Sequence, residues 1–250
     1  MERRERGVDR FGLRGRAALV AGAGGIGAAA AAALAEAGAS VVVADVDDQR
    51  LAALDGVTPL HADLTTAEGS RECVGKAAAI LGGLDVFVHA VGVNDRRPVL
   101  DTPDDVWERI VALNLGSAFW TGRAAGELMV RAGYGRVVYL SSVSGQLAHA
   151  HHAPYAATKG GVNQLLRVMA REWASSGVTV NAVAPGYTET DLTRHHLDLP
   201  GVREELTSLV PAGRLGTVDD LVGPILFLCS AWSSFVTGHV LYADGGRTLV

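Results

Sequence analysis

The sequence predicts an α/β fold: one doubly wound sheet of about seven parallel strands with helices on both faces. Short β-branched runs alternate along the chain with longer segments of helical periodicity. Several of these runs are apolar almost continuously, as expected of strands that are covered on both faces. No linker, low-complexity tract or repeat interrupts the 250 residues. We therefore expect a single domain over residues 15–250, after a charged N-terminal tail over residues 1–14.

The expected elements follow from this alternation, which implies parallel strands joined by right-handed crossovers in a Rossmann-type arrangement. The carboxyl ends of the strands then meet at one edge of the sheet, where such folds bind their ligands. We expect strands at Ala17–Val20, Ser40–Ala44, Pro59–Ala62, Asp85–Ala90, Arg136–Leu140, Val178–Val183 and His239–Tyr242. We expect helices near Ile26–Ala37, Thr66–Leu81, Pro103–Arg131, Pro154–Ser176 and Val218–Ser230.

The composition argues against several classes of protein. A net charge of −5 gives no reason to expect nucleic acid or an anionic membrane as a partner. The uncharged stretch Ala17–Ala35 is long enough for a membrane span, but it is mostly Ala and Gly with a glycine-dense turn inside it. The N-terminus lacks the apolar stretch of a secretory signal. Cys73 and Cys229 lie in apolar helical patterns, so we expect reduced core residues in a cytoplasmic protein.

A glycine-rich turn joins the first strand to an alanine-rich helix. Its sequence satisfies G-x-G-x-x-G in the strand–turn–helix context that binds dinucleotides. Glycines there permit a tight turn and let backbone N–H groups approach a pyrophosphate at the positive end of the helix. The alternative is a turn that serves only the packing of helix on strand. The residues concerned are Gly22, Gly24, Gly25, Ile26 and Gly27.

Asp45 follows the second strand, about 20 residues beyond the glycines. A carboxylate at this strand end accepts hydrogen bonds from a ribose diol and repels the additional phosphate of NADP, so we expect NAD (NADH) as the cofactor. The alternative is that Asp45, Asp47 and Asp48 only cap the next helix. Asp63, after the third strand, is expected to reach the adenine.

A second group of polar residues follows the fifth strand. Ser142 lies at its end, and Tyr155 and Lys159 stand four residues apart on one face of a helix. A phenol is a poor base at neutral pH, but a neighbouring ammonium favours the phenolate. Tyr155 would then exchange a proton with a substrate oxygen that Ser142 holds. The alternative is an ordinary exposed Tyr–Lys pair.

Taken together, these motifs resemble the short-chain dehydrogenase/reductase family over roughly residues 12 to 247. Ser142 precedes Tyr155 by thirteen residues, which is the interval usual in the family. The resemblance implies a catalytic tetrad of Asn114, Ser142, Tyr155 and Lys159. In it Asn114 holds a water of a proton relay, and Lys159 also binds the nicotinamide ribose. The resemblance further implies cofactor contacts from Leu64, Ala90, Gly92, Pro185, Gly186, Thr188 and Thr190.

Two segments depart from the family pattern. The glycine turn has Ala21 in place of the usual Thr and is one residue shorter, and the missing position often carries a basic or hydroxyl side chain. Contacts to phosphate are therefore expected to differ, which again favours NAD. The usual Asn-Asn-Ala-Gly after the fourth strand reads His89-Ala90-Val91-Gly92, so the hydrogen bonds of those asparagines must be replaced or lost.

Within the family the sequence is most similar to gluconate 5-dehydrogenases and related sugar-acid dehydrogenases. We expect a small alcohol or ketone as substrate, with a sugar acid as one candidate. A ketoreductase of 3-oxoacyl thioesters or of secondary-metabolite ketones is the alternative in the same class, and a non-catalytic dinucleotide sensor is the alternative in another. The family also implies a homotetramer. The segments that carry the likeness are Asn94–Pro98, Ala153–Ala157 with Lys159–Gly161, Pro185–Tyr187 and Phe235–His239.

Three loops are expected to line the substrate side: Val93–Leu100, Val143–Ala153 and Tyr187–Pro211. Arg96 and Arg97 could clamp a carboxylate through paired N–H donors, unless they are simply solvated. Five histidines in these loops suggest a metal, but their spacing fits no helical metal pair and the chemistry needs none, so no metal is expected. The expected substrate contacts are Asn94, Arg96, Ser142, Ser144, His149, His152 and Tyr187.

Overall fold

The computed structural model describes residue 9 and residues 11–250, and it confirms the expected fold. One sheet of seven parallel strands has the order β3-β2-β1-β4-β5-β6-β7. The order reverses direction between β1 and β4, so the crevice of a doubly wound sheet opens there. Each strand lies within about two residues of its predicted bounds. The strands are β1 (Ala17–Ala21), β2 (Ser40–Asp45), β3 (Thr58–His61), β4 (Val86–His89), β5 (Gly135–Leu140), β6 (Val178–Pro185) and β7 (Val240–Ala243).

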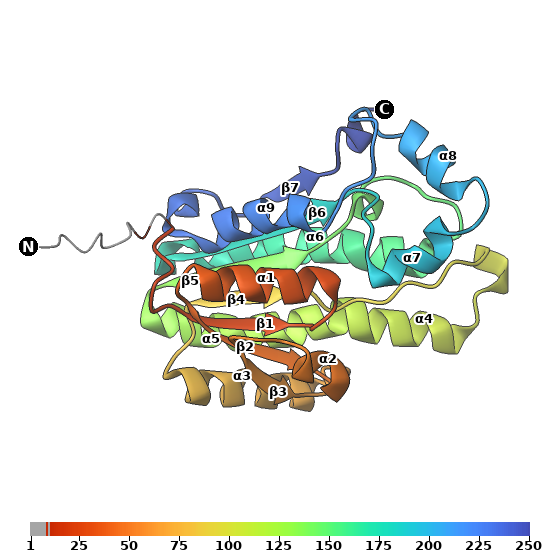
Figure 1. Cartoon of the computed structure of the whole chain (residues 1–250). Helices are drawn as coiled ribbons and strands as arrows, with labels where there is room; N and C mark the ends of the chain where they lie inside the picture. Colours follow the sequence, from red (N-terminus) through yellow and green to blue (C-terminus); the bar gives the residue numbers. More distant parts are fainter. Residues whose placement is uncertain (1–8, 10) are drawn as a thin grey trace, which may run out of the picture.

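Helices cover both faces of this sheet (Figure 1). α1 (Gly25–Glu36) and α9 (Asp219–Cys229) pack on one face, through a core that includes Leu34 and Ile225. α3 (Ala67–Leu81), α5 (Ser117–Ala132) and α6 (Ala153–Trp173) pack on the other. β1 is buried along its whole length, which explains why its sequence is apolar without alternation.

The long helix expected over Pro103–Arg131 is not regular. It consists of α4 (Asp104–Val111), a π-helical segment over Ala112–Gly116, and α5. A π-helical segment widens the helix by one residue and often marks a functional position. Hydrophobic periodicity could not predict it, because one extra residue in the helix hardly disturbs the pattern. Asn114 lies in the middle of this segment.

Three short helices were not predicted: α2 (Asp48–Ala52), α7 (Asp191–Leu197) and α8 (Val202–Ser208). Helices of five to seven residues are too short to show a hydrophobic period. α7 and α8 fall in the region that was expected to be a loop, and they lie beyond the carboxyl ends of the strands (Figure 1). Short 3₁₀ turns complete the fold at Val99–Asp101, Val143–Gly145, Ala174–Ser176, Ala231–Ser233 and Arg247–Leu249.

The domain begins earlier than the tail boundary at residue 14. Leu13 is fully buried, and the ring of Phe11 packs against Trp232 with centroids 5.3 Å apart. Residues 1–8 and 10 of the expected tail lie outside the described residues. Over the part of the chain that is described, no helix is long and apolar enough to cross a membrane.

Candidate active site

The glycine turn forms an open cradle at the amino end of α1. A Cβ on Gly22, whose φ is +103°, would lie 2.9 Å from the carbonyl carbon of Ala90. A Cβ on Gly27 would lie 2.0 Å from the Gly22 oxygen, so neither position admits a side chain. At Gly24 and Gly25 the nearest atoms are 3.7 and 3.8 Å away, which leaves the turn accessible from outside. An accessible backbone at a helix amino terminus fits the pyrophosphate of a dinucleotide.

Asp45 holds the turn to the end of β2. Its carboxylate accepts hydrogen bonds from the backbone N–H of Ala23 at 2.7 Å and of Asp47 at 3.0 Å. The cap of α2 is Asp47, which accepts from the backbone of Gln49 and Arg50. The alternative in which Asp45 serves as a helix cap is therefore wrong, while Asp47 does cap the helix as considered.

A hollow extends from Asp45 along the ends of β2, β3 and β4. Asp63 lines it and binds the backbone N–H and the hydroxyl of Thr65 at 2.8 and 2.7 Å. These hydrogen bonds lower the pKa of the Asp63 carboxyl. A hollow with two carboxylates at strand ends and an open glycine turn fits the adenosine half of a dinucleotide. Its lining includes the expected residues Gly22, Gly24, Asp45, Asp63, Leu64, Ala90 and Gly92.

Asn114 connects the loop after β4 to α6 through hydrogen bonds. Its Oδ1 accepts from the N–H of Val93 at 2.8 Å. Its Nδ2 donates to the Val93 carbonyl at 2.9 Å and to the Thr158 hydroxyl at 3.2 Å. Both amide hydrogens are thus committed to protein atoms. The side chain can offer a relay water only an acceptor, so its first task is to position the neighbours of Lys159.

His89 replaces one of the asparagines that the family pattern has after β4. Its Nε2 lies 2.8 Å from the Ser117 hydroxyl, which itself donates to the Leu113 carbonyl. The imidazole must therefore donate, and burial keeps it neutral by lowering its pKa to about 3. Leu113 belongs to the π-helical segment that carries Asn114. His89 therefore supplies a hydrogen bond that supports this segment, whereas Ala90 has no polar side chain with which to replace the second asparagine.

Ser142, Tyr155 and Lys159 meet in one hollow, as expected. The Ser142 hydroxyl accepts from the N–H of Ser144 at 3.1 Å and is a hydrogen-bond partner of the Tyr155 phenol. Lys159 is buried, and its ammonium donates to the Leu140 carbonyl at 2.7 Å. The Nζ atom lies 5.6 Å from the centre of the Tyr155 ring. Because the Ser142 hydroxyl and the Tyr155 phenol are hydrogen-bond partners, both can reach one substrate oxygen, and the Lys159 ammonium lies beside the phenol ring.

The expected effect of Lys159 on the acidity of Tyr155 is wrong for the ligand-free protein. Burial raises the pKa of Tyr155, and the opposing influences are the hydrogen bond of Ser142 and the positive charge of Arg96. Burial also lowers the pKa of Lys159, to about 8. Both groups are removed from water in the hollow, and this desolvation disfavours the charged form of each. The resting site therefore holds a neutral phenol.

The substrate side of this hollow is polar. His149 links two side chains: its Nδ1 lies 2.9 Å from the Ser144 hydroxyl and its Nε2 lies 3.3 Å from the Tyr187 hydroxyl. The His149 and His152 rings are 5.8 Å apart, and burial lowers the pKa of both. All the expected substrate residues line this hollow, together with the expected cofactor residues Ile26, Pro185, Gly186, Thr188 and Thr190. Asn114, Gly25 and Gly27 do not line either hollow.

The two arginines of the loop after β4 have different surroundings. Arg97 binds Asp95 through two hydrogen bonds, one of them at 2.7 Å, so it is not available to a ligand. Arg96 lines the hollow at its exposed mouth and forms no ion pair with the described residues. Of the expected carboxylate clamp, only Arg96 remains. Within residues 9 and 11–250, no group of three His, Cys, Asp or Glu side chains is arranged to hold a metal ion.

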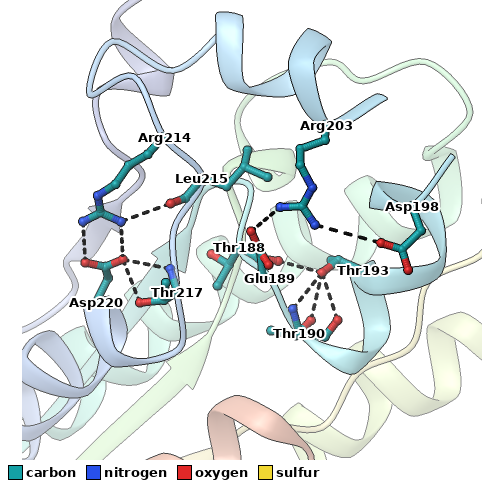
Figure 2. Close-up of polar contacts among 10 residues, drawn as sticks. All are labelled: Thr188, Glu189, Thr190, Thr193, Asp198, Arg203, Arg214, Leu215, Thr217 and Asp220. Atoms are coloured by element: carbon teal, nitrogen blue, oxygen red, sulfur yellow. Dashed lines mark hydrogen bonds and ion pairs between the residues drawn. The ribbon is translucent and has the colours of Figure 1, made fainter. Parts of the chain in front are cut away.

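Residues 188–217, here called the lid segment, contain α7 and α8 and line the substrate side of the hollow through Thr188, Thr190, Leu192 and Thr193. Figure 2 shows its polar contacts. The Thr193 hydroxyl donates to the Thr188 carbonyl at 2.6 Å at the start of α7. Arg203 of α8 forms ion pairs with Glu189 and Asp198. Arg214 and Asp220 form two hydrogen bonds of 2.7 and 2.8 Å where the segment meets α9.

Three features of the site escaped the sequence analysis: the His89–Ser117 pair, the lid helices and Arg50. Arg50 lines the adenosine hollow from α2. It follows Asp45 by five residues, and this short spacing was a sequence signal for a cation close to the Asp45 carboxylate. The two hollows share Ala90, Val91 and Gly92, so together they form one cleft across the strand ends.

Comparisons with known proteins find relatives over nearly the whole chain. A family model described as "Enoyl-(Acyl carrier protein) reductase" matches residues 20–248. The chain is 36% identical over 251 residues to a galactitol 2-dehydrogenase (L-tagatose-forming) of Cereibacter sphaeroides, across 96% of this chain and 97% of the relative. It is 34% identical to the 3-oxoacyl-(acyl-carrier-protein) reductase of Escherichia coli, across 94% and 98% of the two chains. A crystal structure of a gluconate 5-dehydrogenase from Burkholderia cenocepacia in complex with NADP and tartrate matches with a TM-score of 0.91 and 38% identity, across 97% and 98%.

Proposed function

Because the chain belongs to the short-chain dehydrogenase/reductase family of oxidoreductases, we propose that it is an NAD-dependent enzyme that interconverts a secondary alcohol and a ketone, with a sugar acid such as gluconate as substrate. One observation carries the proposal. Ser142, Tyr155 and Lys159 converge in a hollow that continues, past Ala90 and Gly92, into the hollow of the glycine turn. A substrate oxygen and a nicotinamide ring can therefore meet at the phenol.

Tyr155 transfers the proton in this proposal. A bound nicotinamide supplies or accepts the hydride and, when oxidised, adds a positive charge beside the phenol. In ketone reduction the neutral Tyr155 donates its proton to the substrate oxygen. The Ser142 hydroxyl, which is a hydrogen-bond partner of the phenol in the ligand-free site, turns its proton to the same oxygen. In alcohol oxidation Tyr155 must first lose its proton, which its burial opposes. Lys159 holds its ammonium beside the ring and keeps two N–H groups for the nicotinamide ribose.

Asp45 supports NAD as the cofactor. Its two oxygens are fixed by the backbone of the glycine turn and of Asp47, and each retains a lone pair for a ribose hydroxyl. A 2′-phosphate would meet this carboxylate and be repelled. The NADP complex of the Burkholderia relative makes the preference worth measuring directly.

Arg96 supports an anionic substrate. The Arg96 guanidinium, which forms no ion pair with the part of the chain that the structure describes, lies at the mouth of the hollow near Tyr155 and matches the carboxylate of a sugar acid. Ser144, His149 and Tyr187 are linked by hydrogen bonds through His149, and these side chains offer polar groups to the hydroxyls of a sugar acid. The likeness to the Escherichia coli reductase favours a second candidate, the reduction of 3-oxoacyl thioesters.

Turnover with a panel of substrates tests the proposal. NADH oxidation is followed with 5-ketogluconate, a neutral ketose and an acetoacetyl thioester. We expect the highest kcat/KM with the ketogluconate, and a preference for the thioester would select the second candidate. Binding of NADH without turnover of any ketone would indicate a dinucleotide sensor and overturn the enzymatic proposal.

Replacing Tyr155 with Phe tests its role. Tyr155→Phe should lower kcat by at least about a thousandfold, because the acid–base group is removed, while NADH affinity stays within about twofold. Tyr134→Phe, which makes the same change just before β5 at the opposite edge of the sheet, is the control. Turnover retained by Tyr155→Phe would refute the role.

The fold also supports a homotetramer in the cytoplasm. Phe119 of α5 and Val168 of α6 are exposed, and Phe235, ahead of β7, is completely exposed. The family resemblance implies subunit contacts through the long helices expected over Pro103–Arg131 and Pro154–Ser176 and through the C-terminal strand. Exposed apolar side chains on or beside these elements favour burial in such contacts. Cys73 and Cys229 are free thiols in the core, which is compatible with a reducing compartment.

A further inference from the structure

Arg50 brings a positive charge to the adenosine end of the cleft. It lies on α2, and its Nε is 3.3 Å from a carboxylate oxygen of Asp47. Its Nη1 faces the glycine turn, since it is the atom nearest to a Cβ built on Gly24, at 3.7 Å. Arg50 and Asp45 line the same hollow. The guanidinium therefore lies beside the glycine turn, in the hollow that Asp45 also lines.

The charges around this point oppose one another. Asp45 cannot swing away from a ligand, because two backbone N–H groups hold its oxygens. Arg50 is less constrained: its side chain is 55% exposed and its ion pair with Asp47 lies at the surface. Exposed ion pairs of this kind are weak, so the guanidinium can turn toward a stronger anion at little cost. A phosphate on the ribose 2′-oxygen would be such an anion.

The shortened glycine turn makes this cation more important. The turn itself, Gly22–Gly27, carries no basic side chain, and Arg50 approaches it from α2. A positive charge thus reaches the same end of the cleft from a different element. A guanidinium is well suited to phosphate, because its planar N–H groups bind two oxygens at once.

We propose that Arg50 determines how strongly this chain discriminates between NAD and NADP: it offsets the repulsion of Asp45 and allows NADPH to bind, more weakly than NADH. The inference rests on the proposed dinucleotide-binding function. In this inference Asp45 repels the 2′-phosphate of NADPH, and Arg50 binds that phosphate and so allows NADPH to bind.

Direct binding tests this assignment without relying on turnover. The affinities of NADH and NADPH are measured by titrating cofactor fluorescence against the wild-type chain, Arg50→Gln and Asp45→Asn. Arg131→Gln is the matched control, because Arg131 also forms an exposed ion pair on a helix but lies on α5, away from the cleft. The titrations are repeated at low and high salt, because a phosphate contact at the surface weakens as ionic strength rises.

We expect Arg50→Gln to weaken NADPH binding at least about tenfold and NADH binding less than about threefold, with a smaller salt dependence for NADPH. Asp45→Asn should strengthen NADPH binding relative to NADH. An equal loss for both cofactors would mean that Arg50 contacts a group they share, and no loss for either would mean that it contacts neither; both results overturn the inference. So does a wild-type chain that binds NADH but not NADPH. A chain that binds neither cofactor refutes the proposed function itself.

Discussion

Two regions of the site, here called the floor and the lid segment, hold their side chains in place by opposite means. The floor, defined as Asn114, Ser142 and Lys159, is 0 to 7% exposed, and each of its polar groups has a protein partner. In the lid segment the ion pairs of Arg203 lie at the surface, with side chains 41 to 62% exposed. Buried polar groups are costly to leave unpaired, whereas exposed ion pairs contribute little. Substitutions below the floor should therefore affect both chemistry and folding, and substitutions in the lid mainly substrate binding.

His89 provides the largest expected effect, because it is a buried titratable group beneath the floor. Burial lowers its folded pKa to about 3, below the ordinary histidine value of 6.5, so between these pH values the unfolded chain binds the additional proton. The stability that the neutral imidazole contributes is therefore present above pH 6.5 and is lost as the pH falls toward 3. Between pH 6.5 and 4 the wild-type chain should lose about 3 kcal/mol that His89→Asn does not lose.

Urea unfolding at a series of pH values measures this difference. His61→Asn, which removes an exposed histidine paired with Asp48, separates the loss of any histidine from the loss of a buried one. Parallel loss of stability in wild type and His89→Asn on acidification would show that the ring is not held neutral by burial. Burial beneath the floor would then not distinguish its polar groups from the exposed ones of the lid segment.

Asn114 gives the next effect. Asn114→Ala removes the amide that joins Val93 to Thr158, so the loop after β4 and the helix of Lys159 lose their connection. We expect kcat to fall about a hundredfold, which corresponds to roughly 2.7 kcal/mol, with a smaller change in KM. Steady-state kinetics per folded molecule measure it.

Asn181→Ala is the matched control for this substitution. Asn181 is equally buried, and its amide binds the backbone of Val236 and His239, but it lies in β6 and does not line the cleft. It should lower stability and leave kcat within about twofold. If both variants lost kcat alike, Asn114 would be a residue of general structural importance and not a positioning residue of the site.

The sequence predicted the floor far better than the geometry around it. The motif spacing brought Ser142, Tyr155 and Lys159 into one hollow because parallel strands end at one edge and residues four apart share a helix face. Burial was not predictable in the same way: desolvation raises the pKa of Tyr155, although the neighbouring ammonium had suggested the reverse. The π-helical segment and the lid helices were missed because one inserted residue or a seven-residue helix leaves almost no periodic signal. The sequence showed His89 only as a departure from the family pattern after the fourth strand, because nothing in the neighbouring sequence indicates that Ser117 is its hydrogen-bond partner.

Arg203 in the lid gives the smallest expected effect and tests the comparison from the other side. Arg203→Gln removes the ion pairs of α8 with Glu189 and Asp198, both exposed to water and screened by salt. We expect KM to rise less than about threefold, with kcat and NADH affinity unchanged, and the difference should vanish at high salt. Steady-state kinetics at two ionic strengths measure this. A loss of kcat approaching that of Asn114→Ala would mean that the lid is as tightly coupled to the chemistry as the floor, and that surface exposure does not separate the two regions.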